Sequence, residues 1–324
     1  MRLGIVTAVF APGSVEEALD QAVQHGFEAV EFPTGNYGGT PCFDLDLLAA
    51  DRQAVRSLRT AVETRGLTVC ALSCQGNPLH PREEIAGAHH DVLMKTLRLA
   101  AELQVPVVNV FSGCPGAGDG SRFPHWVSCA WPPDFLELLD WQWREKLVPY
   151  WRSVTKEARR LGISKLAVEP MPGFMVYNTR TLLALRAEVG AEIGANLDPS
   201  HLFWQGIDPC LAIRDLGTEG ALFHFHAKDT FLDPLETARN GVFETRPYHR
   251  FGERRWFFRA AGYGHPPETW DRMLLELRRV GYDDTISIEH EDASLSPHEG
   301  VARAAAFLKG RVFREPAPKE IWWG

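Results

Sequence analysis

The sequence has no hydrophobic run long enough to cross a membrane, and its start lacks the apolar stretch of a secretory signal peptide. The first residues, Met1 to Val6, enter a predicted strand at once. The six cysteines include no CxxC pair, and six in 324 residues are too few for a disulfide scaffold. We therefore expect a cytoplasmic protein with reduced thiols and no membrane partner.

Basic residues are also in deficit, with 34 Lys and Arg against 42 Asp and Glu and a formal net charge of −8. Nucleic-acid binding usually depends on Lys and Arg that neutralise phosphates, so this balance argues against a nucleic-acid partner. Hydrophobic residues make up 45% and charged residues 23%, which is ordinary for a globular protein with a substantial core. Composition leaves open whether the chain forms a homo-oligomer.

No GxGxxG or P-loop motif follows the first predicted strand, which argues against a doubly wound nucleotide-binding sheet. Instead, short β-branched or aromatic runs alternate with helical patterns along the whole chain. One phrase recurs near both ends, where Gly26 and Gly281 each precede a predicted strand that closes on Glu31 and Glu289, as expected of a repeated βα unit. The pattern predicts a single (β/α)₈ barrel over residues 1–324, with a C-terminal tail at about 313–324.

Two connections of this barrel are unusually long, from Ser112 to Pro133 after the fourth strand and from Asp229 to Glu268 after the seventh. Long connections in a compact domain are more often substrate loops than filler, so we expect both at the barrel mouth. A helical stretch is predicted for residues 134–161. The eight predicted strands are 3–8, 27–31, 67–72, 107–111, 166–169, 195–198, 223–226 and 286–289.

The last four predicted strands each end on a residue type that binds metal ions, namely Glu169, Asp198, His226 and Glu289. In a closed parallel barrel all strand carboxyl ends meet at one mouth. A single acidic residue after a strand is weak support, because such residues often cap the next helix, but four on successive strands favour a shared site. We therefore predict one divalent ion on these four residues, with Mn²⁺ favoured over Zn²⁺, Co²⁺ or Mg²⁺.

Further polar residues surround the predicted ligands. His224, His226 and Lys228 alternate along one strand and so share one face. His226 is the better ligand because it lies nearer the carboxyl end, and we expect His224 and Asp229 to orient the ligand side chains. Lys228 is predicted either to contact a substrate oxygen or to pair with a barrel carboxylate.

Aromatic and basic side chains in the predicted strand-end loops are candidates for substrate contact, because aromatic faces and fixed donors can hold a polyhydroxylated molecule. Each tryptophan is equally well explained by packing among the loops. The residues are His80, Trp126, Trp131, His201, Trp204, Arg259 and His265.

Several motifs resemble those of the xylose isomerase-like sugar phosphate isomerase/epimerase superfamily, whose members include ketose 3-epimerases, inosose dehydratases and endonuclease IV. The motifs are AVEP, NLDPSHL, HFHAKD and ISIEHED, and the resemblance extends over essentially the whole chain. It implies a TIM barrel, one divalent ion on the same four residues and a substrate-binding role for His201. Endonuclease IV relatives add histidines for a trinuclear zinc site, whereas this chain has Gln75 and Asn109 in that region, which argues against a multi-zinc nuclease.

Two of the predicted ligands, Glu169 and Glu289, would approach a bound sugar from different sides. One can remove the proton beside a ketose carbonyl and the other return it to the opposite face, through an enediolate. We therefore expect a metal-dependent sugar or sugar phosphate isomerase or epimerase. A keto-inositol dehydratase is the near alternative, because it uses the same enediolate. An abasic-site nuclease is a distant one, because it needs a basic groove. A non-catalytic sugar-binding barrel is the third, and it would leave the buried carboxylates without an ion to bind, which is energetically costly.

Overall fold

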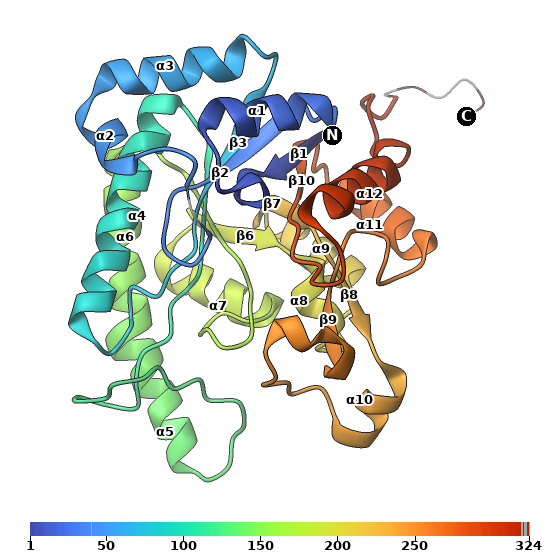
Figure 1. Ribbon diagram of the computed structural model, residues 1–324. Helices are drawn as coiled ribbons and strands as arrows, with labels where there is room; N and C mark the ends of the chain where they lie inside the picture. Colours follow the sequence, from blue (N-terminus) through green and yellow to red (C-terminus); the bar gives the residue numbers. More distant parts are fainter. Residues whose placement is uncertain (40, 319, 321–322, 324) are drawn as a thin grey trace.

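Eight parallel strands close into a barrel in the order β1-β10-β7-β6-β5-β4-β3-β2, and helices surround it (Figure 1). The computed structural model describes residues 1–39, 41–318, 320 and 323. The prediction of a (β/α)₈ barrel is confirmed. The barrel strands are β1 (Arg2–Val6), β2 (Ala29–Pro33), β3 (Thr68–Cys74), β4 (Val107–Val110), β5 (Lys165–Val168), β6 (Ile193–Leu197), β7 (Leu222–Ala227) and β10 (Thr285–Ile288).

Most helices follow a barrel strand and return the chain to the start of the next one, as parallel neighbours require. The helices are α1 (Val15–Gln24), α2 (Leu45–Ala50), α3 (Arg52–Glu63), α4 (Glu83–Leu103), α5 (Asp134–Trp141), α6 (Val148–Arg160), α7 (Thr179–Val189), α8 (Pro199–Phe203), α9 (Pro209–Thr218), α10 (Pro234–Asn240), α11 (Pro267–Arg279) and α12 (Pro297–Lys309).

The first two strands differ in extent from the prediction. Strand β1 ends at Val6, and the 3₁₀ helix η1 (Thr7–Phe10) follows, with the Thr7 hydroxyl donating to the Glu31 carbonyl oxygen at 3.1 Å. Strand β2 begins and ends two residues later than expected. Glu31 therefore lies in the middle of β2 rather than at its end, a shift that matters for the site.

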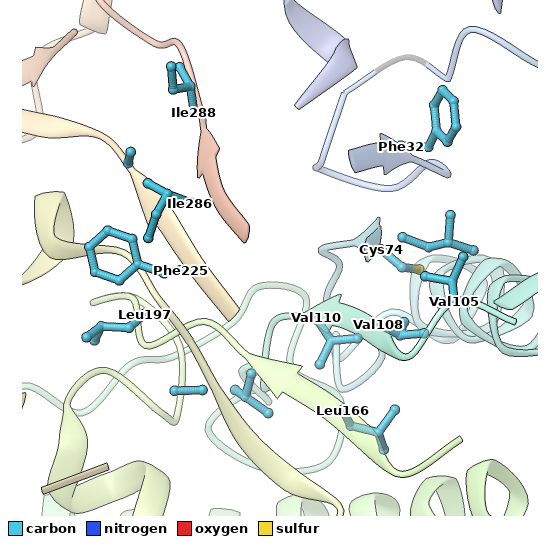
Figure 2. Packing of buried hydrophobic residues seen from close by; sticks show 14 of the residues in the cluster. Phe32, Cys74, Val105, Val108, Val110, Leu166, Leu197, Phe225, Ile286 and Ile288 are labelled. Carbon is cyan, nitrogen blue, oxygen red and sulfur yellow. The ribbon is translucent and has the colours of Figure 1, made fainter. Parts of the chain in front are cut away.

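Outward-facing strand residues form the main hydrophobic layer between barrel and helices. Figure 2 shows Val108 and Val110 of β4, Leu166 of β5, Phe225 of β7 and Ile286 of β10 in this layer, and each is at most 1% exposed. Burying a side chain of this size stabilises the fold by about 1.5–3 kcal/mol. The outer layer therefore supplies much of the hydrophobic stabilisation.

Inward-facing positions are unusually polar for such a barrel, whose interior is ordinarily packed with Val, Ile and Leu. A small apolar cluster of Ala71, Val107, Ala167 and Phe223 occupies part of the interior. The remaining inward positions bring polar side chains into mutual hydrogen-bonding contact below the mouth. These side chains are those of Glu31, Ser73, Asn109, His224 and Ser287.

The long connection after β4 leads into one continuous helical stretch made of α5, the π-helix η2 (Gln142–Leu147) and α6. Gln142 is fully buried, and its side-chain amide donates to the carbonyl oxygens of Gly116 at 3.1 Å and His125 at 2.8 Å. The π-helix therefore fixes the loop that precedes it. Both the long loop and the helical stretch agree with the prediction.

The long connection after β7 forms a small antiparallel sheet of β8 (Asp229–Leu232) and β9 (Trp256–Arg259), joined through α10 and the 3₁₀ segment η3 (Tyr248–Glu253). In Figure 1 the insertions carrying α5 and α10 both extend toward the bottom of the view. The two long connections therefore lie at the same end of the molecule.

The amino terminus lies against the segment that follows α12. The ammonium group of Met1 donates to Asp283 Oδ1 and to the Phe313 carbonyl oxygen, both at 2.7 Å. The rest of the predicted tail includes residues 319, 321, 322 and 324, which fall outside the described residues. Among the helices that the structure describes, none combines the length and the apolarity needed to cross a membrane.

The surroundings of two glycines, one in β6 and one in α4, predict opposite effects of Gly→Ala substitution. A Cβ at Gly194 would lie 2.4 Å from the Phe223 ring and 2.7 Å from the Ala221 carbonyl oxygen, so Gly194→Ala should lower the free energy of unfolding by about 1–3 kcal/mol. Gly87 lies exposed in α4 with no neighbour within 4 Å of such a Cβ, so Gly87→Ala should raise it by about 0.5–1 kcal/mol. Urea unfolding measures both, and equal effects would contradict the packing argument.

Candidate metal centre and substrate cavity

The four predicted ligands converge at the carboxyl ends of the strands. Glu169 directly follows β5, Asp198 caps α8 after β6, His226 lies in β7 and Glu289 directly follows β10. One potential ligand atom from each lies within 4.8 Å of those of the other three. The geometry therefore permits all four to hold one ion, although their role as ligands stays a prediction.

Asp198 uses its two carboxylate oxygens differently. Its Oδ1 accepts from the Ser200 backbone N–H at 2.8 Å and so caps the short helix α8. Its Oδ2 is buried and makes no hydrogen bond to any residue that the structure describes, although it lies 2.9 Å from Lys228 Nζ. A buried carboxylate oxygen in this state is a ready ligand for a cation. The helix cap and the predicted ligand role are therefore compatible.

Glu169 is oriented by neutral and aromatic neighbours. Its Oε2 accepts from Asn196 Nδ2 at 2.9 Å and from Gln75 Nε2 at 3.3 Å, and its Oε1 lies 3.0 Å from His201 Nε2. His201 in turn packs edge-on against Phe258. These contacts fix the Glu169 carboxylate at the mouth.

Lys228 is a cation that lies among the carboxylates. Its Nζ lies 2.9 Å from Asp198 Oδ2, 2.5 Å from Glu289 Oε2 and 2.8 Å from Glu291 Oε2. Burial alone would lower the pKa of Lys228, but attraction to these carboxylates raises it well above its ordinary value. Burial would raise the pKa of Glu289, but Lys228 and then His226 lower it. Of the two roles predicted for Lys228, the structure shows the ion pair.

His226 presents one ring nitrogen to each of two groups of carboxylates. Its Nε2 lies 3.0 Å from Glu31 Oε1, while its Nδ1 lies 3.3 Å from Glu289 Oε2 and 3.7 Å from Glu169 Oε2. Burial lowers the pKa of His226, but Glu31 and Glu289 together raise it well above its ordinary value. Nδ1 is therefore the nitrogen that faces the predicted ion.

Glu31, to which the sequence assigned no role, lies at the centre of the polar interior. Besides His226 it accepts from His224 Nε2 at 2.8 Å and Asn109 Nδ2 at 2.7 Å. The hydroxyls of Ser73 and Ser287 also donate to it. Burial would raise the pKa of Glu31, but His226 and His224 lower it well below its ordinary value. His224, expected to orient the ligands, thus acts on His226 through Glu31.

Glu31 also belongs to a second group of metal-type side chains, with Cys70 and His224. The hydrogen bonds described above already occupy both Glu31 oxygens, and the Cys70 thiol donates to the Val30 carbonyl oxygen at 3.3 Å. Burial raises the pKa of Cys70 well above its ordinary value, which disfavours the thiolate that a metal needs. This group is therefore better explained as a hydrogen-bond network than as a metal site.

Asp229 was expected to orient the ligands, and the structure corrects this. Its Oδ2 accepts from the backbone N–H groups of Gly262, Gly264 and His265 at 3.0–3.1 Å and from Trp270 Nε1 at 2.9 Å. Backbone amides of a loop are the partners of an anchoring carboxylate, and Trp270 is fully buried beneath it. Asp229 therefore holds the loop at 262–265 to the end of β7.

A cavity of about 550 Å³ opens next to the four predicted ligands. Its polar lining consists of Gln75, Glu169, His201, Lys228, Glu289, His290 and Glu291. Its aromatic lining consists of Tyr37, Phe111, Phe174, Tyr248 and Phe258. Phe111 and Phe174 pack with ring centroids 4.5 Å apart, and Tyr248 stacks on Phe258 at 5.5 Å. The cavity thus combines aromatic walls with a charged floor, as small-molecule sites commonly do.

Two predicted substrate contacts lie outside this cavity because they have partners in the β8–β9 sheet and beyond. Trp204 stacks on Trp256 with ring centroids 4.6 Å apart, as the alternative of packing within the loops anticipated. Arg259 pairs with Asp292 at 2.7 Å. Neither residue lines the cavity, so the structure does not support direct substrate contact by either of them.

Four further predicted contacts also lie elsewhere. Trp126 lines a separate pocket of about 230 Å³, and the backbone N–H of Arg82 donates to His80 Nδ1 at 3.0 Å. Trp131 is 76% exposed, and His265 bonds to the Asp229 carboxylate at 2.7 Å. Of the residues predicted to contact substrate, His201 and Lys228 are the two in the cavity wall.

Several residues of the site were missed, for two different reasons. Asn196 and Glu291 each lie two positions from a predicted ligand, so the period of two along an extended chain would have placed them on the same face. Tyr248 and Phe258 come from the insertion after β7, where the sequence shows no pattern that predicts which side chains face the mouth.

Residues 19–311 match the family described as xylose isomerase-like TIM barrel. The chain belongs to this family. It is 36% identical over 314 residues to the uncharacterized protein YfiH of Bacillus subtilis (strain 168), and the match covers 96% of this chain and 99% of that protein.

Solved structures with the same architecture include two enzymes of different classes. The probable 3-DHS dehydratase AsbF from Bacillus anthracis gives a TM-score of 0.66 at 17% identity over 96% of this chain and all of AsbF. The 3-keto-D-glucoside 4-epimerase YcjR from E. coli gives 0.60 at 15% identity over 96% of this chain and 99% of YcjR. Identities this low show a shared fold alone.

The opposed pKa shifts of Glu31 and His226 predict how their pairing contributes to stability in the metal-free protein. Glu31, with its lowered pKa, contributes above about pH 4.5 and loses the contribution as pH falls through its folded-state pKa. His226, with its raised pKa, contributes below about pH 6.5 and loses it as pH rises through its folded-state pKa. The destabilisation caused by Glu31→Gln should therefore be largest between these pH values.

Urea unfolding in the presence of a chelator, repeated across pH, measures this difference. Glu63→Gln on the exposed side of α3 is the matched control and should give a flat difference. A Glu31→Gln effect that is equally flat would contradict the charge pairing.

Proposed function

We propose that the chain is a divalent-metal-dependent sugar isomerase or epimerase that moves a proton on the carbon beside a ketose carbonyl. The observation that carries the proposal is the convergence of Glu169, Asp198, His226 and Glu289 at the wall of one cavity. Two of these carboxylates, Glu169 and Glu289, also line the cavity itself. The family shown by the comparison supports the same class of reaction.

The same four residues are proposed to hold the ion, with Mn²⁺ favoured because the set is three carboxylates and one imidazole. Asp198 Oδ2 is buried and already lies beside one cation, the Lys228 ammonium group at 2.9 Å, and His226 Nδ1 is directed at the carboxylates of Glu169 and Glu289, so these atoms fit a bound cation. A bound divalent ion would polarise the substrate carbonyl and stabilise negative charge on its oxygen.

Glu169 and Glu289 are proposed as the acid/base pair. They follow β5 and β10, which are separated in the barrel by β6 and β7, so they reach the cavity from different sides. The lowered pKa of Glu289 keeps it ionised at neutral pH, which is the form a base requires. One carboxylate takes the carbon-bound proton, the electron pair moves onto the carbonyl oxygen as an enediolate, and the other carboxyl group returns a proton.

His201 and Lys228 are proposed to bind substrate oxygens. His201 Nε2 lies 3.0 Å from Glu169 Oε1 in the cavity wall, so a substrate oxygen beside Glu169 is within its reach. Lys228 lies 2.5 Å from Glu289 and offers a donor on the other side. The two donors would thus lie on either side of the substrate carbon whose proton the two glutamates are proposed to move.

A keto-inositol dehydratase remains the second candidate, because elimination begins from the same enediolate and the fold is shared with a dehydratase. An abasic-site nuclease is disfavoured because Glu289 and Glu291 make the mouth acidic, which repels a phosphate backbone.

The metal assignment predicts different outcomes for two aspartates in the same local setting. Asp198 and Asp208 each precede a proline and cap a helix. Asp198→Ala should lose most bound Mn²⁺ in elemental analysis after equilibrium dialysis, because it removes both a cap and a ligand. Asp208→Ala should keep about one ion per chain and lose the cap, worth roughly 0.5–2 kcal/mol, together with an exposed contact to Arg272 at 3.4 Å. Equal metal content in the two variants would remove Asp198 from the ligand set.

The reaction predicts solvent exchange at one position of the substrate. Wild-type protein loaded with Mn²⁺ and incubated with ketoses in D₂O should incorporate deuterium at the carbon beside the carbonyl, as measured by NMR. Glu289→Gln should slow the exchange by about 10²–10⁴-fold, while elemental analysis still finds metal. Loss of water from a keto-inositol without epimer formation would favour the dehydratase, and metal-dependent cleavage of abasic DNA without exchange would refute the proposal.

A further inference from the structure

The charge of the cavity bears on a question that the proposed reaction leaves open, namely whether the sugar carries a phosphate group. The carboxylates of Glu169, Glu289 and Glu291 line the cavity, and Asp198 lies directly behind Lys228. Among the described residues, the cavity wall holds one lysine and no arginine. Four carboxylates would still exceed the two charges of a bound divalent ion and the one of Lys228. The site is therefore net negative with or without the ion.

The single ammonium group of the cavity is surrounded by carboxylates. Lys228 Nζ makes contacts of 2.5–2.9 Å to Asp198, Glu289 and Glu291, and its side chain is 2% exposed. Its remaining side faces the Phe258 ring, whose centroid is 4.7 Å away. A phosphate drawn to Lys228 would also meet the three carboxylates paired with it, which repel an anion and do not repel a neutral hydroxyl.

Barrels of this type commonly bind phosphate with the loops after the seventh and eighth strands and a helix N-terminus. In this chain Glu291 and Asp292 follow the eighth barrel strand, β10. Arg259, which enters from β9, pairs with Asp292 at 2.7 Å. The next helix, α12, has its N-terminus capped by Ser296, whose hydroxyl accepts from the Glu299 backbone N–H at 3.2 Å. Arg259 and the capped N–H of α12 thus already have partners, while the imidazole of His290 also lines the cavity at this edge.

The remaining walls suit an uncharged molecule. Phe111 and Phe174 form one aromatic pair, and Tyr248 and Phe258 form a second. Aromatic faces contribute apolar surface on which the C–H faces of a sugar can pack. A cavity of about 550 Å³ holds a small monosaccharide.

We infer that the cavity takes an uncharged, unphosphorylated ketose and discriminates against its phosphate ester, with Glu291 as a specificity-determining residue. The inference rests on the proposed isomerase or epimerase activity. Glu291 carries the discrimination because its side chain is 49% exposed at the mouth and so meets an incoming anion first. A like charge placed close to a ligand charge costs affinity at a partly desolvated site.

Matched sugar pairs that differ only in the phosphate group test the inference. The pairs are D-fructose and D-fructose 6-phosphate, D-xylulose and D-xylulose 5-phosphate, and D-ribulose and D-ribulose 5-phosphate. Deuterium incorporation from D₂O is measured for each with Mn²⁺-loaded protein, as a ratio of kcat/KM within the pair. We expect the free sugar to be favoured by about tenfold or more in each pair that reacts.

The variant Glu291→Gln removes one charge from the mouth and keeps the size of the side chain. It should raise kcat/KM for the phosphate ester relative to the free sugar by about tenfold. Glu63→Gln, which makes the same change on exposed α3, should leave the ratio unchanged. A merely structural role for Glu291 would change both members of a pair equally, so a constant ratio would overturn the assignment of this residue.

The outcomes separate the inference from the proposed function. Exchange that favours the phosphate ester in the reacting pairs overturns the inference and leaves the isomerase or epimerase activity standing. No exchange into any sugar of either kind refutes the proposed function, and the inference falls with it. Exchange that favours the free sugar, together with a ratio that shifts in Glu291→Gln alone, supports both.

Discussion

Negative charge buried inside the barrel is the constraint on which the rest of the site depends. A carboxylate removed from water costs several kcal/mol unless a cation or several donors face it. The structure meets this cost twice, with Lys228 beside Asp198 and Glu289 near the mouth and with imidazoles around Glu31 below. The two groups are joined at His226, which faces each with a different nitrogen. A change to either group is therefore felt by the other.

The two faces of the same strands divide the work of the protein. Outward-facing residues such as Leu166 and Phe225 pack in the hydrophobic layer, and their inward neighbours Ala167 and His226 lie in the barrel interior. Because side chains alternate along a strand, a polar interior and an apolar exterior are encoded by adjacent residues. The hydrophobic layer outside the barrel therefore stabilises the fold even though the barrel interior is polar. A domain whose only core was this interior would be destabilised by the same polar residues.

The barrel and the four converging residues were predictable because strand periodicity and barrel closure determine which residues reach the mouth. The position of Glu31 was not, since a strand boundary misplaced by two residues decides whether a side chain closes a strand or faces inward. The partners of Trp204 and Arg259 were equally hidden, because Trp256 and Asp292 lie far along the chain in segments without periodic pattern. Local sequence patterns predict which face of a strand or helix a residue occupies. Contacts between residues far apart in the sequence become visible only in the folded chain.

The small β8–β9 sheet has a consequence for how this fold diversifies. Glu169 and Glu289 follow strands of the barrel, whereas Tyr248 and Phe258 of the cavity wall belong to the insertion between β7 and β10. The insertion forms its own hydrogen-bonded sheet and is anchored at one end by Asp229. Part of the cavity wall thus lies on a segment separate from the strand ends that carry Glu169 and Glu289. Substitutions within residues 230–260 can therefore change the shape of that wall while these two carboxylates stay in place.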